Sequence, residues 1–239
     1  REQDELIRKV IAGFHVEGPF LNASTGFIGA HEPQHVREAN LEDAKRLLEA
    51  GTGLVKLFTL APEQDEEGVV TKYLVEQGVT VSAGHCDPSI DQLKTAVDSG
   101  LSMVTHFGNG CPVELPRHDN VLQRFLSLRD QLWFCFIPDG AHVEFFALKN
   151  YLDLVGIDRS IMTTDAISAA RLGPGLHEIS GITVEVDDEG VARRPGSPNL
   201  AGSTITMPGI RRNLSENLAL SEEEVTALID HNPRKALSL

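Results

Sequence analysis

Residues 13–22, G-F-H-V-E-G-P-F-L-N, contain the transition that decides the fold: a short apolar strand ends at a carboxylate and gives way to a loop. Phe14 and Val16 favour a strand. Gly18-Pro19 cannot extend it, so the strand ends at Glu17. In a parallel barrel, catalytic residues gather at this edge of the sheet. The stretch therefore predicts a functional carboxylate at a strand end.

The same arrangement recurs downstream, where short apolar runs end in polar side chains. After the strand that ends at Glu17, further strands are predicted over residues 54–60, 79–83, 103–105, 132–137 and 160–164. The polar side chains that follow the last four are His85, His106, Asp139 with His142, and Asp165. Helices are predicted over residues 1–10, from Asn40 to Gly51, over 68–77, from Ser89 to Gly100, from Val121, over 143–154, from Ser203 and from Ser221. This alternation predicts the α/β class with a parallel sheet.

The number of strands leaves two architectures open. A closed barrel needs eight strands, so six predict a (β/α)8 TIM-type barrel that lacks its first two units in this chain. An open doubly wound sheet also fits, but it would concentrate its chemistry at one switch point. Polar residues leave most of the predicted strand ends here, which favours the barrel. Residues 1–239 are expected to form one catalytic unit, with an antiparallel hairpin inserted near residues 179–195.

Composition excludes several classes of protein. The net charge of −14 argues against nucleic acid or an anionic membrane as a partner, because both require a basic surface. Nothing resembles a signal peptide, and apolar runs such as residues 132–137 are too short to span a bilayer. Cys86, Cys111 and Cys135 have no C-x-x-C spacing, which argues against a disulfide framework or a thiolate zinc site. We expect a cytoplasmic protein.

Glu17, His85 and His106 together predict a metal site. Carboxylate and imidazole ligands at three strand ends match a catalytic zinc site, which keeps an open position for water. The metal would lower the pKa of that water to about 7 and polarise a carbonyl. A single strand-end histidine has a simpler explanation, a half-buried side chain bonded to a carbonyl oxygen. For all three residues together, the metal site is the better explanation.

Other polar residues each have a structural alternative. Asp165 can act as a general base and acid, or cap the following loop. His142 can lie over a substrate, with Asp139 orienting its loop. His31 and Arg117 lie in loops, where histidines and arginines are mostly solvated, although arginine suits phosphate.

Six ordered signatures cover almost the whole chain. They are H-V-E-G-P-F-L-N at 15–22, G-A-H at 29–31, S-A-G-H at 82–85, V-T-H-F-G-N at 104–109, D-G-A-H-V at 139–143, and T-D-A at 164–166 with L-A-G-S-T-I-T-M at 200–207. In this order they resemble the N-acetylglucosamine-6-phosphate deacetylase family of the amidohydrolase superfamily, which has a (β/α)8 barrel.

The resemblance implies a role for each matching residue. Glu17, His85 and His106 match the ligands of one divalent metal, with zinc expected and iron, manganese or cobalt as alternatives. Asp165 matches the general base and acid that works with a metal-bound water, and His31 matches a residue that holds the substrate and polarises its carbonyl. The residues that match contacts to the sugar phosphate are Asn109, Gly110, Arg117 and His142. The implied reaction releases acetate from N-acetylglucosamine-6-phosphate and leaves glucosamine-6-phosphate, with a homodimer as the expected assembly.

The chain departs from the family pattern beside the expected phosphate contacts. F-G-N-G-C replaces a pattern close to L-F-N-A-M, and R-H-D-N replaces R-x-P-G. The H-x-H strand from which members with a second metal draw ligands is not found in this sequence, nor are the terminal segments that form a small β-sandwich. Two alternatives therefore stay open: an amidohydrolase for another N-acyl or cyclic amide substrate, and a silent barrel that binds a metal or sugar.

Overall fold

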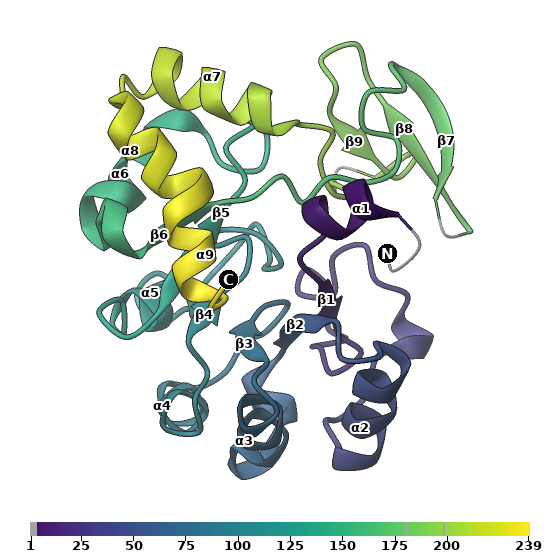
Figure 1. The fold of residues 1–239 in the computed structure, drawn as a ribbon, viewed down its shortest axis with the longest axis vertical. Helices are drawn as coiled ribbons and strands as arrows, with labels where there is room; N and C mark the ends of the chain where they lie inside the picture. The colour runs from purple at the N-terminus through teal and green to yellow at the C-terminus, as the bar shows by residue number, and fades with distance from the viewer. Residues whose placement is uncertain (1–3, 180, 198) are drawn as a thin grey trace.

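A six-stranded parallel sheet organises the computed structural model, which describes residues 4–179, 181–197 and 199–239. Its strands are β1 (Phe14–Glu17), β2 (Val55–Leu60), β3 (Thr80–Ala83), β4 (Met103–Val104), β5 (Trp133–Phe136) and β6 (Ser160–Met162). They follow one another in chain order along an arc (Figure 1). Because the order never reverses among the described residues, the sheet has no switch point, and the doubly wound alternative is wrong.

The predicted barrel lacking its first two units is confirmed only in part: the parallel sheet is present, but the residues that the structure describes do not form a barrel. Among the described residues, β1 pairs only with β2 and β6 only with β5, so the sheet is open between its two ends. A barrel of this type closes with eight tilted strands, and six cannot complete the circle. The chain therefore forms an ordered arc of parallel strands rather than a closed barrel.

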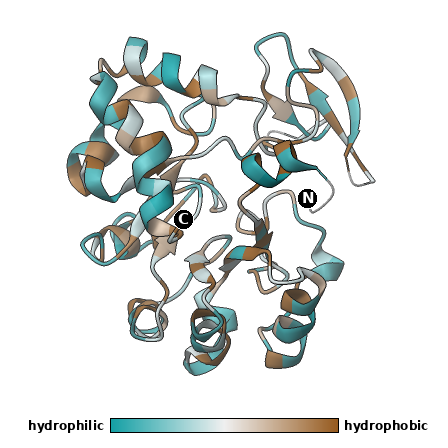
Figure 2. Ribbon diagram, viewed as in Figure 1, coloured by the Kyte–Doolittle hydropathy of each residue, from teal (hydrophilic) through white to brown (hydrophobic). Residues whose placement is uncertain are grey.

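Helices connect the strands and lie outside the arc (Figure 1). They are α2 (Leu41–Ala50), α3 (Val69–Glu76), α4 (Ile90–Asp98), α5 (Val121–Leu126) and α6 (Phe145–Val155), with short 3-10 turns η1 (Pro33–His35), η2 (Pro62–Gln64), η3 (Glu66–Gly68) and η4 (Ile157–Arg159). Asn40 and Ser89 cap α2 and α4 as predicted, each accepting a backbone N–H of the first turn. Figure 2 shows hydrophilic and hydrophobic residues on α2, α3 and α6, as expected of helices that cover a sheet.

The predicted helix start at Ser203 is wrong. The helix α7 (Met207–Asn217) begins four residues later, where the side chain of Thr206 accepts the N–H of Gly209. Ser203 instead forms a parallel bridge with Ala166. Its backbone N–H donates a hydrogen bond to the carbonyl of Asp165, and its C=O accepts one from the N–H of Ile167. Ser203 therefore cannot start a helix.

The last helix continues further than the sequence indicates. Ser221 and Glu224 form the predicted capping box of α8 (Glu222–Thr226), which runs through a π-helical turn, η5 (Ala227–His231), into α9 (Asn232–Ala236). Pro233 lies in the first turn of α9, where its missing N–H costs little. It therefore does not end the helix.

The predicted insertion is a three-stranded antiparallel sheet. Its strands are β7 (Gly175–Ile179), β8 (Ile182–Val186) and β9 (Ala192–Arg193), and residue 180 of the predicted region lies outside the described residues. Asp187 closes the β8–β9 turn by accepting the N–H groups of Glu189 and Val191. The first helix of the chain is α1 (Glu5–Val10), which Asp4 caps. Residues 1–3 of the predicted first helix lie outside the described residues.

The two faces of the large sheet bury different sets of side chains. On the outer face, Phe58, Leu60, Phe134 and Phe136 belong to the main core, which includes residues of all the outer helices. The inner face carries a smaller cluster, Met103, Trp133, Cys135 and Ile161, against which Ala236 and Leu237 of the C-terminal segment pack. None of the described helices has the length and apolar character needed to cross a membrane.

Candidate active site

Four polar side chains leave the same edge of the sheet. Glu17 is the last residue of β1, His85 and His106 follow β3 and β4 by two residues, and Asp165 follows β6 by three. His85, His106 and Asp165 have φ values of 50°, 29° and 46°, in the left-handed region that side chains with a Cβ rarely adopt. Each such backbone costs about 1–2 kcal/mol and persists only where its surroundings impose it, which is typical of functional sites.

Glu17, His85 and His106 form a tight cluster. Oε1 of Glu17 lies 3.1 Å from Nε2 of His85 and 3.0 Å from Nε2 of His106, and the two imidazole nitrogens are 3.1 Å apart. Ligands of a tetrahedral zinc ion are separated by about 3.3 Å, given bonds of about 2.0 Å. The spacing and the donor set therefore fit a divalent cation.

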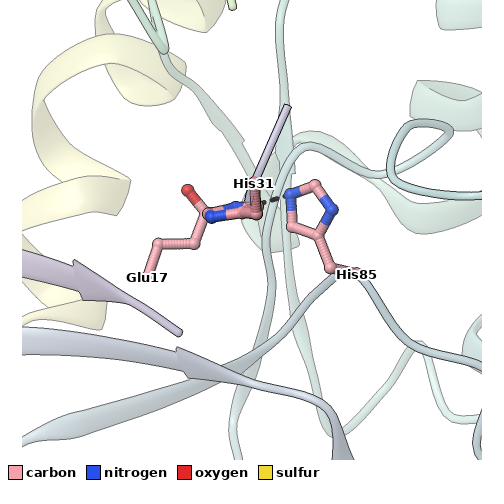
Figure 3. Close-up of side chains that lie close together, drawn as sticks. All are labelled: Glu17, His31 and His85. Atoms are coloured by element: carbon pink, nitrogen blue, oxygen red, sulfur yellow. Dashed lines mark ion pairs between the residues drawn. The ribbon is translucent and has the colours of Figure 1, made fainter. Parts of the chain in front are cut away.

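His31 lies at the margin of this cluster. Its Nε2 is 4.0 Å from Oε1 of Glu17, and Glu17, His31 and His85 each offer a ligand atom within 4.8 Å of the others. Figure 3 shows these three side chains converging. The imidazole of His31 stands edge-on to that of His85, with ring centroids 4.6 Å apart. The His31 imidazole is thus close enough to contact a cation held by the cluster, or a substrate bound beside that cation.

The surrounding backbone orients His85. Its Nδ1 lies 2.7 Å from the carbonyl oxygen of Phe27, which can only accept, so Nδ1 is the donor there and Nε2 is the ring nitrogen that faces Glu17. The loop approaches so closely that a Cβ on Gly29 would lie 2.6 Å from the His85 ring. Gly110, with φ of +61°, also approaches the imidazoles, and a Cβ there would lie 3.1 Å from both His85 and His106. Glycine at these two positions allows the backbone to enclose the imidazoles.

The charges within the cluster shift the pKa values of its members. Burial raises the pKa of Glu17, but hydrogen bonds with His106 and His85 outweigh it and hold that pKa well below its usual value. For His106, burial lowers the pKa, whereas the hydrogen bond with Glu17 raises it, and the net shift is upward. Burial, followed by the proximity of His85, lowers the pKa of His31. Glu17 is therefore ionised at neutral pH, and its negative charge faces both imidazoles.

Asp139 and His142 form a second pair of polar residues. Asp139 holds His142 through a contact of 2.6 Å between its Oδ2 and Nδ1 of the imidazole. Its Oδ1 accepts the backbone N–H groups of Ala141 and His142. The predicted orienting role of Asp139 matches this geometry.

The cavity has a volume of about 870 Å³. It is lined by eight of the nine predicted site residues: Glu17, His31, His85, His106, Asn109, Gly110, His142 and Asp165. The ninth, Arg117, is exposed in its loop and is not among the lining residues. Arg193 of β9 also lines the cavity and pairs with Asp187 at 3.0 Å. Its strand belongs to the insertion, and sequence reasoning did not connect that segment with the site.

Replacing Asp139 with asparagine is expected to lower the free energy of unfolding at pH 7 by roughly 1–3 kcal/mol. Burial raises the pKa of Asp139, but its hydrogen bonds with His142 lower that pKa by more than burial raises it. The pKa in the folded protein therefore lies below the pKa in the unfolded chain. The stabilisation is therefore complete above the unfolded pKa of about 3.9 and is lost as the pH falls through the folded pKa. Urea unfolding at pH 7 and at pH 3 measures the difference.

The matched control is Asp188→Asn, which changes an exposed carboxylate in the β8–β9 turn. It should leave the free energy of unfolding unchanged at both pH values. If Asp139→Asn lowers the free energy of unfolding by the same amount at pH 7 and at pH 3, the ionised carboxylate of Asp139 is not the source of the stabilisation.

Comparisons with known proteins give a consistent result. No protein-family model matches the chain. The chain is 31% identical over 229 residues to an N-acetylglucosamine-6-phosphate deacetylase of Lysinibacillus sphaericus, covering 96% of the chain and 58% of the relative. It is 27% identical over 229 residues to an N-acetylgalactosamine-6-phosphate deacetylase of Escherichia coli O157:H7, covering 96% and 59%.

A solved structure supports the same relationship. The crystal structure of N-acetyl-D-glucosamine-6-phosphate deacetylase from Mycobacterium smegmatis matches with a TM-score of 0.88 and 30% identity, covering 98% of this chain and 62% of that one. The chain thus spans somewhat less than two thirds of the proteins it matches. Over that length, the chain is similar to N-acetylglucosamine-6-phosphate deacetylases, as the sequence signatures predict, and also to an N-acetylgalactosamine-6-phosphate deacetylase.

Proposed function

We propose that this chain carries the catalytic site of a metal-dependent deacetylase that hydrolyses the N-acetyl group of an amino sugar phosphate, N-acetylglucosamine-6-phosphate. The observation that carries the proposal is the cluster of Glu17, His85 and His106, whose donor atoms lie 3.0–3.1 Å apart in a cavity of about 870 Å³. The names of the homologues support the choice of substrate. Residues 1–239 would then form part of one cytoplasmic enzyme that acts as a homodimer.

Glu17, His85 and His106 would hold one divalent cation, with zinc favoured by the carboxylate and imidazole donors. Such a cation supplies Lewis acidity, which polarises the acetyl carbonyl and makes water more acidic. Asp165 lines the same cavity. It accepts a proton from the attacking water as the water oxygen bonds to the carbonyl carbon. Asp165 then returns that proton to the sugar nitrogen as the C–N bond breaks, giving the free amine and acetic acid, which releases its proton to become acetate.

The remaining lining residues would position the substrate. His31, beside the cluster, is placed to donate to the acetyl oxygen. The side-chain nitrogen of Asn109 is buried and has no hydrogen-bond partner among the described residues, so a donor is available to the sugar phosphate. Asp139 fixes His142, another lining residue, through Nδ1 and leaves Nε2 free of that contact. Gly110 brings backbone to the same region without a side chain.

One observation favours a second candidate, an amidohydrolase for an N-acyl substrate that carries no phosphate. Arg117, the expected phosphate contact, is exposed and does not line the cavity. For Arg117 to contact the phosphate, it would have to reach the cavity of a second subunit, or the loop that carries Arg117 would have to move.

Acetate release from N-acetylglucosamine-6-phosphate and from N-acetylglucosamine separates the two candidates. For the zinc-loaded protein, we expect kcat/KM to be at least about 100-fold higher with the phosphorylated sugar, since two charge-assisted hydrogen bonds contribute about 3 kcal/mol or more. N-acetylgalactosamine-6-phosphate in a third reaction tests the choice of sugar. Equal rates with and without phosphate would favour the second candidate, and no acetate from any of them would contradict the deacetylase.

A further inference from the structure

One carboxylate outside the cavity connects the loops that carry Glu17 and His85. Glu63 lies in η2, directly after β2. Its Oε1 accepts the side-chain amide of Asn22 at 2.9 Å and the backbone N–H of Asp87 at 2.6 Å. Asn22 belongs to the loop that follows Glu17, and Asp87 lies two residues after His85. A single oxygen thus bridges two loops whose ends carry the site.

The bridge continues through the backbone to His85 itself. The N–H of Asn22 donates to the carbonyl oxygen of His85 at 2.9 Å. The side chain of Asn22 also accepts the N–H of Ser24, which makes its own loop rigid. His85 has a left-handed φ of 50°, a conformation that persists only where the surrounding structure imposes it. Two contacts constrain the chain directly after its Cα: the hydrogen bond from Asn22 to its carbonyl and the hydrogen bond from Asp87 to Glu63.

We propose that Glu63 is a positioning residue. It holds the backbone of His85 in the conformation that directs the His85 imidazole toward Glu17 and His106. The inference rests on the proposed function, because it concerns the affinity of that site for a divalent cation. Glu63 belongs neither to the Glu17, His85 and His106 cluster nor to the residues that line the cavity, so it acts through Asn22 and Asp87.

The burial of Glu63 argues against a role in stability alone. Its second oxygen, Oε2, is buried and has no hydrogen-bond partner among the described residues. Burial raises the pKa of this carboxyl above its usual value even though the Asp87 N–H and the Asn22 amide donate to it. Placing a half-satisfied carboxylate in such a position costs folding free energy. An acceptor that bridges both loops explains why a carboxylate is found there.

Cation affinity is the measurement that separates positioning from stability. Zn²⁺ and Co²⁺ dissociation constants of the metal-free protein are measured in competition with a chromophoric chelator, together with the visible spectrum of the Co²⁺ form and the unfolding temperature without metal. Glu63→Ala should weaken binding by about 10–100-fold, the range found when partners of metal ligands are removed. The Co²⁺ spectrum should also change. Glu63→Gln keeps an acceptor at Oε1 and should recover part of both.

Glu66→Ala is the matched control, because Glu66 is an exposed carboxylate in the same loop. It should bind both ions as the unaltered protein does. If Glu63→Ala fails to fold, Asn22→Ala removes the amide donor instead and should weaken binding in the same direction. Affinity and a Co²⁺ spectrum unchanged in Glu63→Ala, or in Asn22→Ala where that variant replaces it, would overturn the inference while leaving the proposed function intact. If the unaltered protein binds neither ion, the proposed function fails and this inference fails with it.

Discussion

Replacing Asp165 with asparagine is expected to lower kcat for acetate release by about 10²–10⁴-fold, the usual contribution of a positioned proton acceptor. Asparagine has nearly the same shape and tolerates the left-handed φ of 46° found here. The backbone bonds at this position, including that from the N–H of Ser203 to the carbonyl of Asp165, do not involve the carboxylate. The variant should therefore keep its fold and its metal while losing proton transfer.

Single-turnover rates and metal content, measured on the same samples, test this expectation. Asp98→Asn changes an exposed carboxylate at the end of α4 and serves as the control that should retain full activity. A variant at Asp165 with normal kcat would remove that residue from the mechanism. A variant that loses its metal as well would assign Asp165 to the cation site instead of to proton transfer.

Local signals predicted the strand ends and most of the site. At Glu17, Gly18-Pro19 ends the strand, and at His85 the preceding Gly84 does so, because glycine and proline act on the backbone beside them. The register of a parallel sheet then brings such residues to one edge: Glu17 pairs with Thr59, and Thr59 with Ser82. The strand-end residues Glu17, His85, His106 and Asp165 line one cavity for this reason.

Features that depend on distant contacts could not be predicted in the same way. Ser203 precedes a run that fits a helix start, yet its backbone pairs with residues on either side of Ala166, almost 40 positions away along the chain. Strand β7, Gly175–Ile179, is stabilised by pairing with β8, and its own sequence, G-L-H-E-I, carries only a weak strand signal. Arg117 has the chemistry of a phosphate contact, but the path of its loop decides where its side chain lies.

The insertion also contributes to the site in a way that local patterns do not reveal. Ile179, Ile182, Val184 and Arg193 line the cavity. Arg194, next to Arg193, donates to the carbonyl of Ala30 and pairs with Glu32, which are the neighbours of His31. These bonds attach the insertion to the loop that carries His31, so the three-stranded sheet forms one wall of the cavity.

Replacing Glu17 with glutamine should weaken divalent cation binding by at least about 100-fold, more than the loss expected from partners outside the site. The amide retains the size of the side chain and one oxygen, but it removes the negative charge that faces both imidazoles at 3.0–3.1 Å. A dication then meets neutral donors only, and hydrolysis should fall with occupancy. Adding zinc in excess should restore part of the metal content, because His85 and His106 keep their positions.

Metal analysis after dialysis and calorimetric titration with Zn²⁺ measure this effect. Glu49→Gln, which changes an exposed carboxylate on α2, controls for the loss of one negative charge from a strongly acidic protein. It should bind zinc as the unaltered protein does, since charges on the outer surface are screened by salt within about 10 Å. Zinc bound equally well by Glu17→Gln would mean that the cluster is held together by hydrogen bonds alone, and the site that the strand ends form would then need another explanation.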